Sequence, residues 1–362
     1  MYNPSEIENF EMLSSYLRTT PENLSKFVHG ARYVIDFSDL GSLNAIPKFS
    51  EDQNRTDFQR FYIPKKNKKL GYRIIYKSFQ QFTKDILKVL NFNLKLIYTP
   101  NEYVHGFING RNTRSNASAH LGNQFLLKLD IKNFFESIEI DSVEEAFLSL
   151  GFMESIAADL AKICTLDDKV VQGFPTSPVV ANIVCDAMDI EIQKLCSHYD
   201  AAYTRYADDI SISGNGILPP VHEISSILNN YNFKLNTKKT QRFKRGQNLY
   251  VTGLSISDQS YPRIPKAVKK RIRQHLYYIK KFGFHSHICR LNGFSEDIEK
   301  SSTNSLISHL ENYLEGWINY MKPIEPDLAE SFRLQLNEIK EIHYADLRKM
   351  LKQSNGVFNI RL

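Results

Sequence analysis

The sequence predicts an α+β fold, in which a mixed region of strands and helices precedes a helical region. Residues 60–76 alternate between apolar and polar side chains, as a β-hairpin does. An apolar run of strand length ends in an acid, Asp130. From Pro265 onward, apolar residues recur at the spacing of amphipathic helices. The boundaries we expect are 1–50 for an N-terminal helical segment, 51–255 for the mixed region and 256–362 for the helical region with a C-terminal extension.

The composition indicates a soluble protein of more than one domain. The chain has 362 residues, and 42% of them are hydrophobic. No stretch of about 18 apolar residues predicts a transmembrane helix, and the first residues lack the features of a secretory signal. The four cysteines show no Cys-x-x-Cys spacing, which argues against a zinc site or a disulfide framework. We therefore expect a cytoplasmic protein that has no membrane partner.

The positive charge is concentrated in two segments. Residues 60–88 contain nine Lys or Arg side chains and one acid, Asp85, and residues 263–290 contain nine and no acid. The rest of the chain carries 28 basic and 39 acidic side chains. Two basic segments on an otherwise acidic chain suggest a clamp for a polyanion such as nucleic acid. A solvated basic surface is the alternative.

The N-terminal elements are expected to be short helices followed by a hairpin. Thr20 and Pro21 are a typical N-cap residue and first helical residue. Residues 60–76 predict a hairpin whose turn is basic, and residues 79–97 predict a helix with one apolar face. Nothing in the first 50 residues carries chemistry, so we expect that segment to support the fold.

The tetrapeptide Tyr206-Ala207-Asp208-Asp209 carries the clearest chemical signal. The segments on both sides of it, 202–205 and 210–213, are rich in β-branched and aromatic residues and predict a second hairpin. The two aspartates would lie at its tip, where adjacent carboxylates repel each other unless a cation lies between them. Carboxylate oxygens suit Mg²⁺. The alternative is a solvated turn, because Asp is common in turns.

The strand that ends at Asp130 favours the metal site over the solvated turn. If Asp130 lies beside Asp208 and Asp209, three carboxylates share one site. Three carboxylates can hold two Mg²⁺ ions about 3.5–4 Å apart, as in-line phosphoryl displacement requires. We expect one ion to activate an attacking 3′-hydroxyl and the other to stabilise the leaving pyrophosphate.

These motifs resemble those of reverse transcriptases. Asp130 matches the first palm motif and Tyr206–Asp209 the second, and Gln-Gly-Phe-Pro-Thr-Ser-Pro at 172–178 resembles the glycine-proline motif. Asn-Ala-Ser-Ala-His at 116–120 and Val-Thr-Gly at 251–253 match the bacterial retron group. The resemblance implies a right-hand polymerase, with fingers and a palm containing an antiparallel sheet in residues 51–255 and a helical thumb after them.

The resemblance also implies catalytic and nucleotide-binding roles. Lys239 lies in a segment that resembles the family's Asn-x-x-Lys-Thr, so it would lie near the triphosphate and protonate the pyrophosphate, which contributes about 10²–10⁴-fold. Arg73 matches an arginine that contacts the triphosphate, and Lys65 or Lys69 would assist. Phe135 matches the bulky residue that excludes a 2′-hydroxyl, although it could equally be a core residue. The implied catalytic residues are Asp130, Asp208, Asp209 and Lys239, the metal ligands Asp130, Ile131, Asp208 and Asp209, and the nucleotide-binding residues Arg73, Lys69, Phe135, Gln172 and Gly173.

RNA-binding residues are expected in the two retron segments and in the helix that begins near Pro265. In that helix Val268, Ile272, Leu276 and Ile279 form an apolar stripe, and basic side chains lie outside it. For His120, structural hydrogen bonding is the alternative to RNA contact. The residues expected to contact RNA are Asn116, His120, Val251, Thr252, Gly253, Lys269, Lys270 and Arg273.

The implied function is RNA-directed DNA synthesis from dNTPs with two Mg²⁺ ions. Resemblance to retron enzymes implies a dedicated structured non-coding RNA as template and primer, and priming from the 2′-hydroxyl of a branching guanosine. The branched RNA–DNA product is called msDNA. The resemblance further implies anti-phage defence together with a separate effector protein. Two alternatives stay open: a bacterial reverse transcriptase of another type, such as one from a group II intron, and a scaffold that mainly holds nucleic acid and the effector.

Overall fold

The computed structural model describes residues 3–36, 55–65, 71–297 and 299–354. The chain forms two compact units. Strands and helices alternate in the first unit and the second is mainly helical, so the predicted α+β class is confirmed. Within the described ranges, every helix is too short or too polar to span a lipid bilayer. The first unit contains Met1–Asn112 and Asn123–Arg245, and the second contains Thr113–Gly122 and Gly246–Leu362.

The N-terminal part of the first unit contains helices and one strand that was not expected. The hydroxyl of Thr20 accepts a hydrogen bond from the backbone N–H of Asn23, which caps α2, Pro21–His29. The next strand, β1, Ala31–Asp36, pairs in parallel with β2, so residues 1–50 are not helical throughout. Before α2 lie a 3₁₀ turn, Pro4–Glu6, and α1, Phe10–Tyr16.

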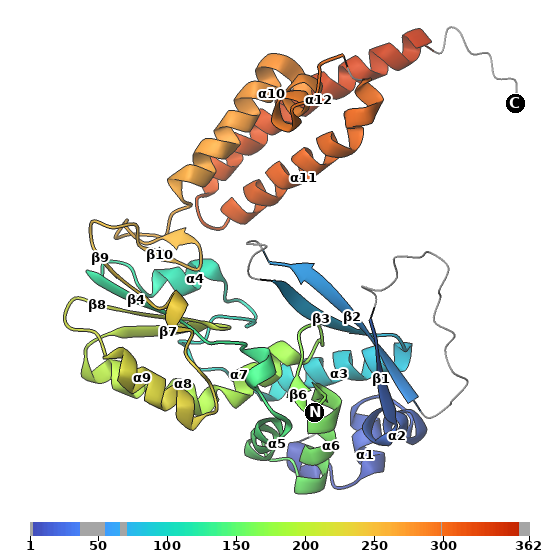
Figure 1. Ribbon diagram of the computed structural model, residues 1–362, viewed down its shortest axis with the longest axis vertical. Helices are drawn as coiled ribbons and strands as arrows, with labels where there is room; N and C mark the ends of the chain where they lie inside the picture. Colours follow the sequence, from blue (N-terminus) through green and yellow to red (C-terminus); the bar gives the residue numbers. More distant parts are fainter. Residues whose placement is uncertain (1–2, 37–54, 66–70, 298, 355–362) are drawn as a thin grey trace, which may run out of the picture. The chain divides into compact units, whose positions relative to one another are not determined.

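The predicted hairpin is present as the antiparallel pair of a three-stranded sheet (Figure 1). The sheet order is β1-β2-β3, where β2 is Arg55–Pro64 and β3 is Tyr72–Ser78. Antiparallel pairing of β2 and β3 joins Ile63 to Arg73. The predicted helix follows as α3, Gln81–Ile97.

A four-stranded antiparallel sheet carries the acidic motifs. Its order is β7-β8-β4-β9, so β4 is an inner strand although it comes first in the sequence. Leu126, Leu127 and Leu129 of β4 are buried, as the apolar run predicted. Helices α8 and α9 cover one face of the sheet (Figure 1). The bounds are β4 Phe125–Asp130, β7 Ala202–Tyr206, β8 Asp209–Gly214, β9 Gln241–Lys244, α8 Asp186–His198 and α9 Val221–Asn230.

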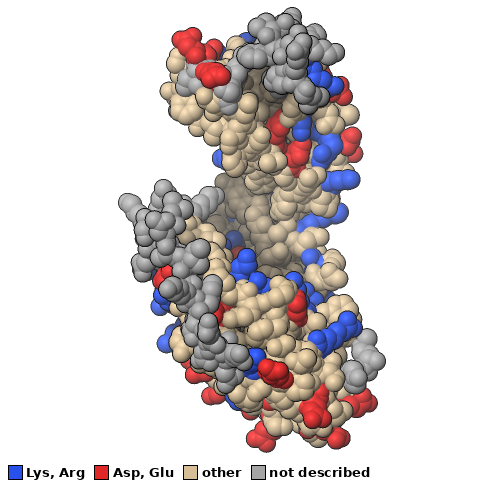
Figure 2. Space-filling view, turned by 90° about the vertical axis from the view of Figure 1, so that its right-hand side faces the viewer, with Lys and Arg blue, Asp and Glu red and all other residues tan. Residues whose placement is uncertain are grey.

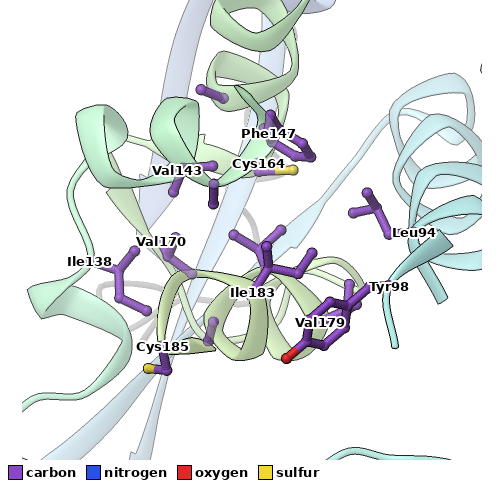
Figure 3. Packing of buried hydrophobic residues seen from close by; sticks show 14 of the residues in the cluster. Leu94, Tyr98, Ile138, Val143, Phe147, Cys164, Val170, Val179, Ile183 and Cys185 are labelled. Atoms are coloured by element: carbon purple, nitrogen blue, oxygen red, sulfur yellow. The ribbon is translucent and has the colours of Figure 1, made fainter. Parts of the chain in front are cut away.

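A continuous hydrophobic core joins the helices of the first unit. Val179 and Ile183 of α7, Ser177–Val184, pack with side chains from α3 and from α5, Ile140–Ser149 (Figure 3). Each fully buried aliphatic side chain of this size contributes about 1.5–3 kcal/mol. The same core contains α6, Glu154–Cys164, and the short pair β5, Thr165–Leu166, and β6, Lys169–Val170.

The second unit packs three long helices beside a small hairpin. Helix α10 carries the predicted stripe: Ile272, Leu276 and Ile279 are buried and Val268 is half-buried. Gly283 interrupts α10 with a positive φ of 79°, a conformation that glycine adopts without a steric penalty. The elements are α4 Thr113–Ser118, β10 Tyr250–Val251, β11 Leu254–Ser255, α10 Lys266–Asn292, α11 Asn304–Met321 and α12 Pro326–Ser354.

Candidate active site

The sheet register brings the three predicted acids together at one end of the β4–β8 pair. Asp130, the last residue of β4, pairs with Asp209, the first residue of β8. Asp208 lies in the turn between β7 and β8, and its carbonyl accepts a hydrogen bond of 3.0 Å from the backbone N–H of Ile131. Asp130 is 5% exposed and Ile131 is 1% exposed. The acids therefore share one site, as predicted.

The turn is held in an uncommon backbone conformation by a close neighbour. Ala207 has a φ of 58°, in the left-handed region that few non-glycine residues adopt. Gly106 packs directly against it, because a Cβ at residue 106 would lie 2.5 Å from the backbone nitrogen of Ala207. Hydrogen bonds between the main chains of Arg205 and Tyr103, and of His105 and Arg205, fix this contact. The segment that precedes residue 107 thus supports the acidic turn.

Two side chains from the segment after α9 hold Asp130. Lys239 donates to Oδ1 at 2.5 Å, and the amide of Asn236 donates to Oδ2 at 2.9 Å. Burial pulls the pKa of Lys239 down, but its hydrogen bond with Asp130 and the three nearby carboxylates outweigh burial and raise it. The resemblance predicted a lysine at this site, and the structure brings its ammonium to the first acid of the motif.

The carboxylates make the site electrostatically unfavourable for further negative charge. Burial, and then the neighbouring charges of Asp209 and Asp130, raise the pKa of Asp208 to about 6. Burial also raises the pKa of Asp209, and Asp130 adds to the shift while Lys128 opposes it. A cation bound between these oxygens would relieve the repulsion.

The donor set suits Mg²⁺, although the side chains are not closed around one ion. In the described part of the chain, no three His, Cys, Asp or Glu side chains are arranged so that they could hold a metal together. Carboxylate and backbone carbonyl oxygens are nevertheless the hard ligands that Mg²⁺ prefers. Both oxygens of Asp130 are hydrogen-bonded to Lys239 and Asn236. Each oxygen keeps a further lone pair, but the ammonium of Lys239 would repel a cation bound there, so a metal competes with Lys239 for Asp130.

A buried ion pair beneath the turn was not predicted. Arg205 and Asp189 are both fully buried, and two guanidinium nitrogens donate to the carboxylate, the shortest contact being 2.6 Å. A third nitrogen, Nη1, donates to the side chain of Asn182 at 3.1 Å and to the carbonyl of Ala207 at 3.2 Å. The amide of Asn182 in turn donates to the carbonyl of Gly106 at 2.9 Å. Arg205 thus links α8 to both segments that form the turn.

One sequence signal could have revealed this network. Arg205 interrupts a strand that is otherwise apolar or β-branched, directly before the acidic turn. A guanidinium in a buried strand needs a carboxylate partner, because an unpaired buried charge is strongly destabilising. Asp189 lies on the preceding helix and is the acid that meets this need.

The glycine-proline segment lies against the three-stranded sheet. Gly173 has a φ of 112°, and a Cβ there would lie 2.1 Å from the carbonyl oxygen of Tyr76. The backbone N–H of Tyr76 donates to the carbonyl of Gln172 at 2.7 Å. Ile75 contacts Gly173, and Arg73 lies on the same face of β3 because side chains two residues apart share a face. Arg73 therefore faces the side where residues 172–173 lie.

Phe135 is only partly buried, unlike its neighbour. Phe134 is 5% exposed and stacks on Phe233 in the core. The ring of Phe135 lies 6.2 Å from that of Phe107 and 5.3 Å from that of Phe134. Phe135 thus packs at the edge of the core and is only partly buried. Lys69 lies outside the described residues, and Lys65 donates its backbone N–H to the carbonyl of Gly71.

The two retron-like segments meet in the second unit, but most of their side chains are buried. Asn116 is 1% exposed, and His120 and Val251 are fully buried. The Thr252–Gly253 turn remains accessible, with φ values of 45° and 81°. Thr252 donates to the carbonyl of Thr113 at 3.1 Å and accepts from the amide of Asn116 at 3.4 Å. Direct RNA contact is therefore expected of Thr252 and Gly253 and not of the three buried side chains, which shape the turn.

The basic helix is partly neutralised by acids from elsewhere in the second unit. Lys269, predicted to contact RNA, is 17% exposed and forms an ion pair of 3.1 Å with Glu325. Its contact here is structural, because without it the buried carboxylate of Glu325 would keep only the backbone N–H of Ile264 and the guanidinium of Arg263 at 3.9 Å. Lys270 and Arg273 are exposed, and Arg273 also lies over the ring of Phe332. Figure 2 shows Asp and Glu side chains among the Lys and Arg side chains of the surface.

The comparisons with known proteins identify a family. Residues 63–256 match the family described as reverse transcriptase (RNA-dependent DNA polymerase). The retron Ec86 reverse transcriptase of Escherichia coli is 31% identical over 57% of this chain and 65% of that protein. The retron Mx65 reverse transcriptase of Myxococcus xanthus is 28% identical over 62% of this chain and 52% of that protein.

The matched region spans about half to two thirds of the length of these two relatives. The retron Ec83 reverse transcriptase of E. coli is 25% identical over 72% of this chain and 92% of that protein. Among solved structures, a telomerase from Candida albicans has a TM-score of 0.42 and 14% identity, covering 80% of this chain and 60% of that one. That similarity is too low to support an argument about the fold.

Proposed function

Because the chain belongs to the reverse transcriptase family, we propose that it is an RNA-directed DNA polymerase of the retron type. It copies a dedicated structured RNA, which serves as template and primer, into the branched RNA–DNA molecule msDNA. Similarity to several retron reverse transcriptases favours this type over one from a group II intron. The observation that carries the proposal is the pairing of Asp130 with Asp209, since it unites the carboxylates that polymerisation needs.

The architecture we propose is that of a right hand. The fingers and palm occupy residues 51–255, where the β1-β2-β3 sheet and the β7-β8-β4-β9 sheet would form the two parts. Residues 1–50 support the fingers, and residues 256–362 form the helical thumb and a C-terminal extension. The long helices after residue 265 support this division.

Asp130, Asp208 and Asp209, together with the carbonyl of Ile131, would hold two Mg²⁺ ions. When bound, these ions would supply the Lewis-acid stabilisation of the charge that develops during phosphoryl transfer. Lys239 would leave Asp130, remain charged because of the surrounding carboxylates, and donate its proton to the departing pyrophosphate. The raised pKa keeps Lys239 protonated while it contacts Asp130. Leaving that carboxylate for the pyrophosphate would lower the pKa and make the proton easier to transfer.

The nucleotide would be held from the side of β3. Arg73, with Lys69 from the hairpin turn, would bind the triphosphate, for which a planar guanidinium is well suited. The backbone of Gln172 and Gly173 would support the base and the template. The partly buried ring of Phe135 would exclude a 2′-hydroxyl and so select dNTPs. The partly exposed position of Phe135 supports this role over a purely structural one.

The proposed biological setting is a cytoplasmic anti-phage defence system in which a separate effector protein acts with the msDNA. A competing possibility is that the chain serves mainly as a scaffold for nucleic acid and effector. The two are distinguished by whether bound nucleic acid, recovered from the purified protein, contains newly made DNA joined to RNA through a 2′-linkage.

The direct test is primer extension on an RNA template with dNTPs and Mg²⁺. Asp208→Asn combined with Asp209→Asn removes two anionic ligands, so DNA synthesis should fall by several orders of magnitude while RNA binding persists. The matched control is Asp200→Asn, which changes an exposed acid on the loop before β7. Near-normal extension by the double variant would contradict the site assignment.

A further inference from the structure

The second unit contains an open cavity of about 550 Å³ that has no role in the reaction described above. One wall is the Thr252–Gly253 turn, and the other is a single side of α11. The side chains that α11 contributes are mainly aromatic. They are Tyr313, Trp317 and Tyr320, with Asn312 and Gly316 beside them.

The aromatic side chains form a continuous wall because of helical spacing. Residues 313, 317 and 320 differ by four and three positions, so they lie on one face of the helix. The rings of Tyr313 and Trp317 are 6.5 Å apart, and those of Trp317 and Tyr320 are 5.7 Å apart, both in edge-to-face geometry. All three are partly exposed, whereas Leu314 and Ile318 point into the core. Ring faces and edges are thus presented to the cavity.

The middle of this wall lacks a side chain. Gly316 lies in the interior of α11, where glycine is less favourable than alanine. A Cβ at this position would meet no atom within 4 Å, so packing does not require a glycine. Gly316 lines the cavity and places no side chain in it.

Hydrogen bonds fix the cavity walls in place. The hydroxyls of Thr113 and Tyr320 are 2.9 Å apart, and Thr252 donates to the carbonyl of Thr113. The ring of His275, on α10, lies 5.9 Å from that of Tyr313 in edge-to-face geometry. The turn, α4, α10 and α11 therefore all hold the aromatic wall, and the site is formed before any ligand binds.

Two exposed arginines lie on elements that hold the wall, Arg271 on α10 and Arg114 on α4. Arg271 is exposed and close enough to His275 to lower its pKa, although burial of His275 contributes more. Arg114 is exposed, follows Thr113 and donates to the carbonyl of Pro323 at 2.7 Å, just beyond α11. An aromatic cavity with polar groups at its edge and cations beside it fits a planar, polar ring that is attached to phosphates.

We propose that this cavity binds one unstacked nucleobase of single-stranded RNA, with the flanking phosphates near Arg271 and Arg114. The inference rests on the proposed function, since it names how the RNA partner is held, but it concerns a site separate from the carboxylates. Unstacked bases are the usual targets of aromatic side chains in RNA recognition. An apolar peptide is less suited, because the nearby charges are cationic and the cavity edge is polar.

Trp317 provides a direct probe, because it is the only tryptophan of the chain. The full chain is titrated with a short single-stranded oligoriboadenylate, and the fluorescence of Trp317 is recorded. A base that stacks in the cavity quenches this fluorescence in a saturable manner. The control ligand is an abasic oligoribonucleotide of equal length and charge, which should bind weakly and leave the fluorescence unchanged.

Two substitutions at one position complete the test. Gly316→Leu fills the cavity and should weaken binding of the oligoriboadenylate about 5-fold to 150-fold, the range for losing one stacked base. Gly316→Ala is the matched control, because a single methyl group fits the open space and favours the helix, so quenching should be retained. Circular dichroism checks that both variants are folded. If the leucine variant is unfolded, the proposal is decided by the unaltered chain alone. Its Trp317 fluorescence should be quenched by the oligoriboadenylate and not by the abasic ligand.

Equal quenching by the abasic ligand, no quenching by either ligand, or unchanged affinity of folded Gly316→Leu would each overturn the proposal. Quenching by an apolar peptide but not by RNA would overturn it in favour of protein docking. The proposed function is scored separately by primer extension. Extension without base-dependent quenching refutes only the cavity, whereas quenching without extension refutes only the polymerase assignment.

Discussion

The ammonium nitrogen of Lys239 lies 2.5 Å from Oδ1 of Asp130, so a cation just before β9 neutralises the acid that ends the inner strand β4. The lysine side chain is 58% exposed and the aspartate side chain 7% exposed, so the pair joins an exposed cation to a buried anion. The stability that such an exposed lysine contributes is at most about 1 kcal/mol. Its importance is therefore expected in the chemistry and not in folding.

Lys239→Ala should lower the rate of nucleotide addition about 10²–10⁴-fold if the ammonium protonates the pyrophosphate. Lys239→Arg keeps the positive charge near Asp130 but gives up a proton far less readily, so it should remain slow. Single-turnover incorporation of one dNTP measures the rate of each variant. Full activity in the arginine variant would mean that charge alone is required and would refute the proton-donor role.

The raised pKa of Asp208 predicts a pH-dependent stability in the presence of a chelator. In the folded chain the pKa of Asp208 is about 6, above the ordinary value for an aspartate. At pH values between the ordinary pKa and 6, the folded chain therefore binds more protons than the unfolded chain. Stability should therefore fall as pH rises through this window, by up to about 3 kcal/mol from this group. Urea unfolding of the unaltered chain and of Asp208→Asn measures the difference.

Asp208→Asn should remove that part of the pH dependence and be the more stable chain at neutral pH. Added Mg²⁺ should stabilise the unaltered chain more than the variant, because a bound cation offsets the repulsion. If the free energy of unfolding depends on pH in the same way in the two chains, Asp208 is not the group with the raised pKa.

The Arg205–Asp189 ion pair should stabilise the fold and also hold the turn that carries Asp208, because Arg205 donates to the carbonyl of Ala207. Arg205→Met leaves the buried carboxylate of Asp189 without its cation and with only the hydroxyl of Tyr203 as a partner, which should lower the free energy of unfolding by about 3–5 kcal/mol. Adding Asp189→Leu removes the orphaned charge and should restore much of the stability. Thermal unfolding of the two single variants and the double variant gives the coupling energy.

The double variant should nevertheless remain slow in primer extension, because the hydrogen bond from Arg205 to the carbonyl of Ala207 is still absent. A double variant with both stability and activity restored would show that the pair does not position the turn.

Lys269 and Lys270 are neighbours in the sequence but should respond differently to substitution. Lys269→Ala leaves Glu325 without its ammonium partner, so stability should fall by about 1–3 kcal/mol with no change in the salt dependence of RNA binding. Lys270→Ala combined with Arg273→Ala should leave stability nearly unchanged and make the log–log salt slope shallower by up to about two units.

Binding curves over a range of KCl concentrations, together with thermal unfolding, decide between these effects. Lys280→Ala is a matched control for Lys270, since its exposed ammonium is already paired with Glu338. If the log–log salt slope of RNA binding changes in Lys269→Ala but not in the variant with Lys270→Ala and Arg273→Ala, then Lys269 contacts RNA and the other two residues do not.

The features that the sequence alone determined are those that depend on neighbouring residues. The hairpin around Asp208, the strand that ends at Asp130 and the helix that begins after Pro265 all follow from local periodicity and turn chemistry. The roles of Lys239 and Arg73 came from a motif match, because nothing in their immediate surroundings marks them as special.

The tertiary structure alone decided which side chains meet across long separations. Glu325 lies 56 residues from Lys269, and Asp189 lies 16 residues from Arg205, so neither partner could be read from local pattern. The parallel strand β1 and the burial of Asn116 and His120 also depend on distant segments. Burial and pairing are properties of the folded surroundings, and they decide whether a charged or polar side chain binds a partner molecule or stabilises the fold.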